Sequence, residues 1–565
     1  MAIIEPAGDR DWRLFIPKLA VALKEGYGWR DLRADAIAGL TVAIVAAPLS
    51  MALAIASGVA PERGLFTAIV AGFLISALGG VRQQIGGPAG AFVVVVFNIV
   101  DKYGYDGLVV ATVMAGIMLI LAGLARIGTY IKYVPHPVVA GFTTGIAVII
   151  FTSQVGEVLG LRIADLPADV AGKWSAYAAH LGATEPMTLA IALGALALIV
   201  GLRRYAPQLP GFLIAVVLSA IAVALFALPV ETIATRFGGI PSALPAPSLP
   251  PVSWEKIVEL FPSAFTIAFL GGIESLLCAV VADGMTGRRH RSNLELVAQG
   301  VANIGSAAMG GIAATGTIAR TATNIRAGAT SPVAGMLHAL FILLAMLIFA
   351  PWAGMIPLAG LAAVLVVVAW NMSEPKQFLH LMSAPPGERL VLLSTFLLTV
   401  FVDLTVAIEV GMVLAAFLFM HRMAKAVEIG TGAHLIDEDV DDFAAARPDV
   451  IDRADMPPGV EVFQINGPFF FGAANRLSDV LARMSKPPKV FILRMGRVPL
   501  IDASGVHALQ SFVEECRKKG TQVVLSGVKP AVGEVISRMG LMVRMAKNLE
   551  RALILAREIE AAPPH

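Results

Sequence analysis

Long apolar runs dominate the first 425 residues of this 565-residue chain. A helix that spans a lipid bilayer needs roughly 20 mostly apolar residues. Charged residues make up only 15% of the sequence, against about 25% in a typical soluble domain. We therefore expect a multi-pass membrane protein, with twelve candidate spans at 36–56, 62–80, 107–126, 135–155, 187–203, 209–228, 261–283, 292–311, 331–350, 353–373, 388–403 and 405–423.

Two further segments, at 88–99 and 315–327, are apolar but short or interrupted. The placement of Lys and Arg favours counting both as membrane elements, because cytoplasmic loops are rich in these residues. With both included and the N-terminus in the cytoplasm, the basic residues gather in the loops after the even-numbered helices. The prediction is fourteen membrane segments, with both termini in the cytoplasm.

Fourteen segments divide into two sets of seven, and an odd number of helices per set gives the two sets opposite orientations. After a cytoplasmic N-terminal segment at 1–34, we expect the first seven-helix repeat at 35–228 and the second at 261–426. The proline-rich loop at 229–260 marks the junction between them. The predicted membrane domain is therefore an all-α inverted repeat.

The two short segments are the third helix of each predicted repeat. Interrupted helices at matching positions of inverted repeats are typical of the binding site of a transporter. Gly86 and Gly87 precede Pro88 in one, and Thr315 to Thr317 precede Ile318 in the other. A helix that starts inside the membrane presents unpaired N–H groups and the positive end of its dipole. Together these two helix starts predict an anion-binding site.

Arg320 lies within the second short helix. An arginine at the centre of a membrane costs about 2.5 to 3.5 kcal/mol on insertion scales, so its side chain is expected to face a water-filled cavity or a partner. A fixed positive charge beside two helix N-termini favours anions. The alternative is a structural ion pair between Arg320 and Glu274, with no role in binding. Arg326 is nearer the helix end and is interpreted as structural.

Glu274 stands in the middle of the apolar run at 270–284. A stripe of small residues, Gly271, Ser275, Cys278 and Ala282, follows one face of this predicted helix and suits close packing against another helix. Glu274 adjoins the stripe, so we expect it to point into the protein, where it could bind and release a coupling proton. A structural hydrogen bond or ion pair is the alternative.

Other classes of function find no support in the sequence. The net charge is only +2, which gives no reason to expect a nucleic-acid partner. No residues have the spacing of a metal site or of a catalytic triad, so we predict neither an enzyme nor a metal centre. We also predict no cofactor other than a co-transported proton, with sodium as the alternative ion.

A soluble region follows the membrane domain. The segment 427–458 is predicted to be an acidic linker, and from 459 to 565 strands and helices alternate, which indicates a cytoplasmic α/β domain. Asp502 and Ser504 fall at the start of a helix that follows a strand. Ser504 is a possible regulatory site, and the alternative is that the motif only caps the helix.

Several motifs together resemble a known family. The stretches "GGPAGAFVVVV", "GGIESLLCAVVADG", "GTIARTATNIRAGATSP" and "LIDASGVHAL" occur in the order found in the SulP (sulfate permease) family of anion transporters with a C-terminal STAS domain. The similarity covers nearly the whole chain. "AWNMSEP" and the region after Glu274 look most like the branch that contains a bacterial C4-dicarboxylate transporter.

The resemblance implies a core domain that moves against a gate domain in an elevator-type mechanism, in a homodimer in the bacterial inner membrane. It also implies a substrate site between the third and tenth helices, against the first. Many relatives have a polar residue at the position of Leu49 and a serine at that of Ala319, so backbone amides are expected to matter more here. The implied binding residues are Pro48, Leu49, Ser50, Gly90, Ala91, Thr317, Ile318, Ala319 and Arg320.

The predicted function is proton-coupled uptake of C4-dicarboxylates such as succinate, fumarate and aspartate. Proton coupling is favoured because sodium-coupled bicarbonate members carry aspartate where Glu274 stands. Sulfate or bicarbonate transport is the alternative within the class. An uncoupled anion channel and a membrane-tethered regulator that acts through its STAS domain are the alternatives outside it. The expected partners are a small anion, membrane lipid and, for the STAS domain, a cytoplasmic regulator.

Overall fold

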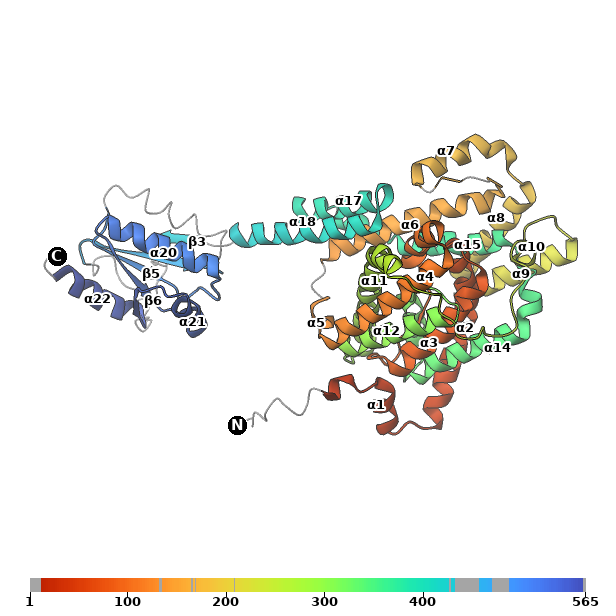
Figure 1. Ribbon diagram of the computed structural model, residues 1–565, viewed down its shortest axis with the longest axis horizontal. Coiled ribbons are helices and arrows are strands. Elements are labelled where there is room, and N and C mark those ends of the chain that lie inside the picture. The colour runs from red at the N-terminus through yellow and green to blue at the C-terminus, as the bar shows by residue number, and fades with distance from the viewer. Residues whose placement is uncertain are drawn as a thin grey trace. The chain divides into compact units, whose positions relative to one another are not determined.

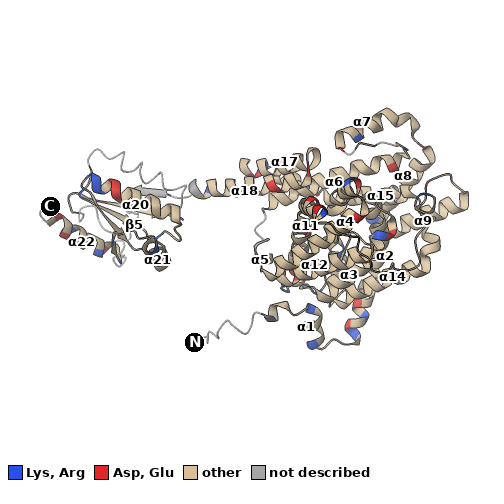
Figure 2. Cartoon of the chain, in the orientation of Figure 1, with Lys and Arg blue, Asp and Glu red and all other residues tan. Residues whose placement is uncertain are grey.

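The computed structural model describes residues 12–131, 135–163, 166–167, 169–207, 209–425, 428–431, 457–469 and 487–561. The chain forms two compact units, residues 1–412 and 413–565 (Figure 1). Lys, Arg, Asp and Glu are sparse over the helices of the first unit (Figure 2). Nine helices of the described chain are long and apolar enough to cross a membrane. The first unit is therefore a multi-pass membrane domain.

The helices of the first half match the seven predicted segments when α4 is counted as two. Gly104, with φ of 70°, breaks the helical path inside α4, because only glycine adopts this backbone conformation without strain. The short helix predicted at 88–99 thus continues through a kink into the next span. The elements are α2 (Trp29–Ala56), α3 (Pro61–Leu78), α4 (Val93–Leu124), α6 (His136–Leu159), α8 (Pro186–Tyr205) and α9 (Gly211–Phe226).

The second half contains the other seven segments. They are α11 (Trp254–Thr286), α12 (Ser292–Ala308), α13 (Ile318–Arg326), α14 (Val333–Ala353), α15 (Leu358–Met372), α17 (Pro386–Phe401) and α18 (Leu404–Lys425). Each predicted segment therefore has a helical counterpart in the described chain, although only nine of the described helices are long and apolar enough to span a membrane. Several starts differ. The largest differences are at α2, which begins at Trp29 rather than 36, inside the segment assigned to the N-terminal lead-in, and at α11, which begins at Trp254 rather than 261. Helix α15 begins at Leu358 rather than 353.

Short helices that were not predicted occupy several of the connections. A search for membrane spans does not detect these helices, because they are much shorter than the apolar run that a span requires. They are η1 (Trp12–Phe15), α1 (Lys18–Lys24), α5 (Gly128–Ile131), α7 (Val170–His180), η3 (Leu181–Ala183), α10 (Ile233–Phe237) and α16 (Pro375–Leu381).

One feature departs from an all-α membrane domain. The residues before the two short helices form an antiparallel pair of two-residue strands, β1 (Gly86–Gly87) and β2 (Thr315–Gly316). Gly86 pairs with Gly316, and Gly87 pairs with Thr315. The chain then turns into η2 (Gly90–Phe92), which leads into α4, and into α13. Backbone pairing thus satisfies polar groups that would be costly to leave unpaired inside a membrane protein.

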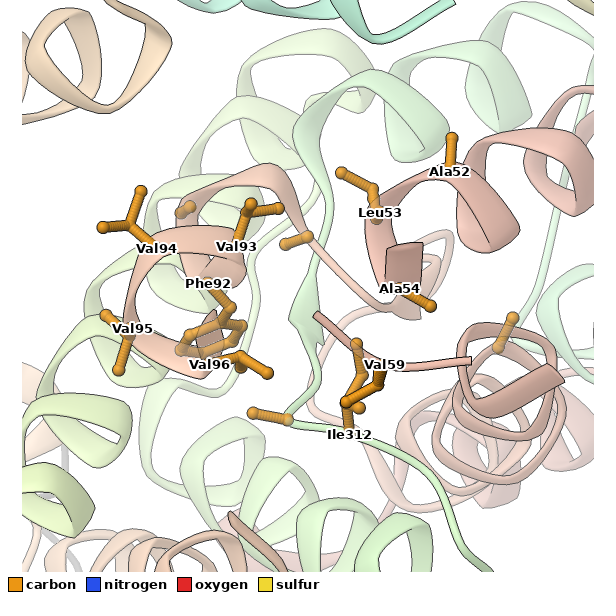
Figure 3. Packing of buried hydrophobic residues seen from close by; sticks show 14 of the residues in the cluster. Ala52, Leu53, Ala54, Val59, Phe92, Val93, Val94, Val95, Val96 and Ile312 are labelled. Atoms are coloured by element: carbon orange, nitrogen blue, oxygen red, sulfur yellow. The ribbon is translucent and has the colours of Figure 1, made fainter. Parts of the chain in front are cut away.

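Apolar packing surrounds this pair of strands. Phe92, the last residue of η2, and Val96, near the start of α4, are buried with Ile312, which precedes β2. Figure 3 shows Phe92 and Val96 on one side of the extended backbone, with Leu53 and Ala54 near the end of α2 on the other and Ile312 beside Val59. Both broken helices therefore start inside the main hydrophobic core of the membrane domain.

The second unit has a five-stranded sheet in the order β3-β4-β5-β6-β7. The β3–β4 pair is antiparallel and the other pairs are parallel. Buried side chains from the two faces of the sheet form two separate cores, one with α20 and α21 and one with α22. The elements are β3 (Glu428–Thr431), β4 (Val460–Asn466), β5 (Val490–Arg494), α20 (Ala503–Lys518), β6 (Gln522–Ser526), α21 (Pro530–Arg538), β7 (Arg544–Ala546) and α22 (Leu549–Ala561).

The α/β alternation predicted for this region is confirmed where the structure describes it. The start of the predicted linker at 427–458 contains strand β3, which pairs with β4, whereas the acidic stretch at 432–456 lies outside the described residues. The alternating pattern also predicts a helix at 474–485, and this segment lies outside the described residues as well. Strand β7 and helix α22 were not predicted, since β7 has only three residues.

A tight helix contact suggests a first test. A Cβ atom at Gly64 of α3 would clash with the carbonyl oxygen of Ser50 in α2. We expect Gly64→Ala to destabilise the membrane domain by about 1 to 3 kcal/mol, because overpacking forces the backbone apart. Thermal unfolding in detergent measures the change. Gly194→Ala in α8 is the control, since nothing lies within 4 Å of a Cβ there. Equal unfolding temperatures for the two variants would contradict the prediction.

Candidate functional site

The candidate site is built around the starts of η2 and α13. Ala89 and Thr317 are the N-cap residues of these helices, and the side chain of neither caps its helix with a hydrogen bond. The first amides of a helix have no partner within the helix, and here they follow directly after the paired strands. Ile318 is 39% exposed and Ala319 is also exposed. The α13 start is therefore open, as an anion site requires.

Thr317 and Thr321 tie the α13 start to the strand that leads into β1. The backbone N–H and the hydroxyl of Thr317 both donate to the carbonyl oxygen of Ile85, at 2.9 and 3.0 Å. The N–H of Ile85 donates in turn to Oγ1 of Thr321 at 3.0 Å. Three hydrogen bonds thus fix the second helix start to the first broken segment.

Arg320 is 3% exposed and extends from α13 toward α2. Its Nη2 donates to Oγ of Ser50 at 3.2 Å. Its Nε and Nη1 atoms are buried, and none of the described residues accepts a hydrogen bond from them. A buried guanidinium without an acceptor is costly, so an anionic ligand that accepts these hydrogen bonds would stabilise the arrangement.

Gly87 explains how the guanidinium fits beside β1. A Cβ atom there would lie 2.5 Å from Nη1 of Arg320, and the φ of 152° is one that side chains rarely adopt. The backbone conformation therefore favours glycine at this position, and any larger residue would also displace the tip of Arg320. In the sequence, Gly87 is recognised only as one of the two glycines that precede Pro88, and nothing there links it with Arg320.

The ion pair considered between Arg320 and Glu274 is not present, although both residues are described. Glu274 is half-buried in α11, and no described residue forms a hydrogen bond or an ion pair with it. The small-residue stripe is buried as predicted: Gly271, Ser275, Cys278 and Ala282.

The turns on either side of Glu274 contact the second broken segment. Thr315 Oγ1 donates to the carbonyl oxygen of Gly271 at 3.0 Å, and Cys278 Sγ donates to Thr321 Oγ1 at 3.1 Å. Glu274 therefore belongs to the part of α11 that holds β2 and α13 in place. A change in its charge would act close to the helix start.

The other predicted residues differ in their surroundings. Ser50 is fully buried against Arg320, whereas Leu49 is half-buried. Pro48 lines an apolar cavity of about 570 Å³ between α2, α3, α9 and α14, so it faces hydrophobic side chains. The structure thus brings Ser50 together with Arg320, and it places Pro48 against a different, apolar space.

Sequence reasoning missed two side chains that cover the start of η2. A Cβ atom at Gly90 would lie 2.6 Å from Sδ of Met372 and 3.7 Å from Cδ1 of Ile150. Met372 ends α15 and Ile150 belongs to α6. Neither carries a sequence signal of binding, because methionine and isoleucine are ordinary core residues. Ala91, next to Gly90, is 2% exposed.

Family models match most of the chain. The sulfate permease family model matches residues 32–395, and the STAS domain model matches residues 453–552. The chain belongs to the sulfate permease family. Members of this family are membrane transporters, so the expectation that the chain is not an enzyme is confirmed. The fold class predicted from the resemblance is confirmed as well.

Relatives and solved structures agree with this assignment. A putative sulfate transporter of Bacillus subtilis, YvdB, is 40% identical over 93% of this chain and 97% of its own length. The bicarbonate transporter BicA of a Picosynechococcus species is 30% identical, with 92% of each chain covered. The structure of SLC26A9 superposes with a TM-score of 0.84 at 19% identity, over 99% of this chain and 97% of that one.

Arg320 gives the most direct test of the site. We expect Arg320→Ala to weaken anion binding at least about tenfold, because hydrogen bonds to charged groups contribute about 1.5 to 3 kcal/mol. Binding to the purified protein and its unfolding temperature should be measured together. Arg326→Ala is the matched control, since Arg326 is exposed at the other end of α13. Unchanged affinity in Arg320→Ala would assign the arginine a structural role.

Proposed function

We propose that this chain is a secondary active transporter that moves a small anion across a bacterial inner membrane by an elevator-type mechanism. One observation carries the proposal: Arg320 presents two buried, unpaired guanidinium N–H groups beside a helix start that has no side-chain cap. Unpaired amides, a helix dipole and a fixed positive charge all favour a negatively charged ligand. The family assignment supports the same class of solute.

For the substrate, the comparisons favour a small inorganic oxyanion. The relatives quoted above are named for sulfate and bicarbonate. The prediction of C4-dicarboxylates came from the resemblance of "AWNMSEP" and its neighbours to one branch, and the named relatives do not support it. Sulfate and bicarbonate are therefore placed first, and succinate and fumarate remain the competing substrates in the test below.

The site residues divide into three roles in this proposal. The amides of Gly90, Ala91, Ile318 and Ala319 bind the anion, and Arg320, held by Ser50, balances its charge. Thr317 fixes the helix start through Ile85, and Leu49 forms the apolar wall beside Ser50, whereas Pro48 faces the separate apolar cavity. The remaining proposals are a homodimer, cytoplasmic termini, and Ser504 as a regulatory site. Ser504 is exposed one residue inside α20, which Asp502 caps through the N–H of Gly505 at 2.7 Å.

Uptake into liposomes tests the substrate and the driving ion. Purified protein should concentrate labelled sulfate or bicarbonate when a proton gradient is imposed, and labelled succinate and fumarate are compared under the same gradient. Preference for the dicarboxylates would restore the original substrate prediction. Flux that follows the membrane voltage but never concentrates substrate would indicate an uncoupled channel and contradict the proposal.

Glu274 is proposed to carry the coupled proton. We expect Glu274→Gln to abolish accumulation driven by a proton gradient while leaving exchange of substrate across the membrane, because a glutamine does not titrate. Uptake and counterflow in the same liposomes measure the two activities. Glu255→Gln is the control, since Glu255 is an exposed acid on the first turn of the same helix. Accumulation driven by sodium alone would refute this role.

A further inference from the structure

A stripe of polar residues follows one face of α12. Glu295, Gln299, Asn303 and Ser306 are spaced four, four and three residues apart, so they lie along one side of the helix. All four side chains are 0% exposed. Polar side chains inside a membrane domain are expensive unless they are paired, so their partners indicate what the stripe does.

Two residues of the stripe hold the backbone that leads into β2. Asn303 donates from Nδ2 to the carbonyl oxygen of Ala314 and accepts from the N–H of Ala314 at Oδ1, both at 2.9 Å. Its amide thus pairs with Ala314 as a neighbouring strand would. Ser306 donates to the carbonyl oxygen of Ile312 at 2.7 Å, while the N–H of Ile312 donates to Thr67 Oγ1 of α3 at 2.7 Å.

Of the other two residues, Glu295 holds the backbone that leads toward β1, and Gln299 supports Glu295. Glu295 Oε2 accepts from the N–H of Gly80 at 2.8 Å, and Glu295 Oε1 accepts from Nε2 of Gln299 at 2.8 Å. Asn303 links its own contacts near β2 to Glu295 and Gln299, since its Nδ2 also donates to the carbonyl oxygen of Gln299 at 2.8 Å. The stripe therefore contacts both broken segments from a single helix.

The opposite side of α12 packs closely on α4. A Cβ atom at Gly116 of α4 would lie 2.7 Å from the carbonyl oxygen of Gly300, and one at Gly123 would lie 2.6 Å from that of Asn293. Contacts of this closeness leave little freedom for one helix to move relative to the other. Both glycines lie beyond the kink at Gly104, so this packing fixes α12 to the second part of α4, which is joined to η2 through that kink, while α12 holds the backbone before β2.

We propose that α12 sets the separation of the two helix starts, with Asn303 as the central positioning residue, and that this separation determines which anions the site distinguishes. The inference rests on the proposed function. Asn303 touches no substrate in this account. It acts through Ala314, the residue immediately before β2, whose pairing with β1 positions Thr317 and α13.

The test compares three variants of the full-length protein in binding experiments with sulfate, bicarbonate and succinate. Asn303→Leu removes both hydrogen bonds to Ala314 at similar volume, and Ser306→Ala removes the bond to Ile312. Val301→Ala is the control, a partly buried position on the same helix that has no polar side chain. We expect Asn303→Leu to weaken binding of the preferred anion about tenfold and to change the ratios of the three dissociation constants.

A purely structural role predicts a different result. It would lower the unfolding temperature and change all three dissociation constants by the same factor. Either this outcome or three unchanged dissociation constants would overturn the inference. If Asn303→Leu does not fold, Ser306→Ala is the test of the inference. A change of about threefold in the ratios of the three dissociation constants would support a positioning role, and constant ratios would contradict it.

Arg320→Ala separates this inference from the proposed function. Lost binding in Arg320→Ala, together with wild-type constants in Asn303→Leu, would refute only the role of α12. Wild-type protein that binds none of the three anions would refute both.

Discussion

The pairing of β1 with β2 is the interaction on which the candidate site depends. Each strand has two residues, and each leads within three residues to the start of a helix inside the apolar core. Backbone that leaves the helical conformation in a membrane domain must find hydrogen-bond partners within the protein. By pairing with each other, the two interruptions satisfy this requirement and also bring segments about 230 residues apart to the same place.

The surroundings of this pair form two layers of support. Threonines act nearest the strands, since Thr315 bonds to α11 and Thr317 bonds to the residue before β1. Behind them, the polar face of α12 satisfies the backbone that enters both strands. Arg320 is the exception in this network, because its guanidinium has only Ser50 as a partner among the described residues. A site that leaves charge unpaired inside a well-paired network is suited to a ligand.

Much of this arrangement could be predicted from sequence. The apolar runs gave the spans, and the glycines before Pro88 and the threonines before Ile318 indicated where helices start in mid-membrane. The inward position of Arg320 follows from the cost of exposing it to lipid. The absence of an ion pair with Glu274 could not be predicted, because two charges in one membrane domain can lie on different faces, and sequence spacing does not fix the distance between helices.

The α12 stripe shows a second limit of the sequence analysis. Glu295, Gln299, Asn303 and Ser306 have a helical spacing that the sequence displays, yet the segment was recognised only as a span. Their partners are backbone groups of Gly80, Ile312 and Ala314. Nearly every residue has the same backbone groups, so the sequence does not show which of them these side chains bind. The role of Met372 was hidden for a related reason, since a terminal sulfur that fills a gap beside a glycine looks in sequence like any other apolar residue.

The contact between Met372 and Gly90 has a kinetic consequence. The three atoms nearest to a Cβ placed at Gly90 are Sδ and Cε of Met372 and Cδ1 of Ile150, so the tips of two side chains cover the start of η2. Side-chain rotations take about picoseconds to nanoseconds at open positions, whereas collective movements of helices take about microseconds to milliseconds. Met372 is partly buried against the main core, and a rotation of its side chain alone would uncover this helix start without a collective movement of helices.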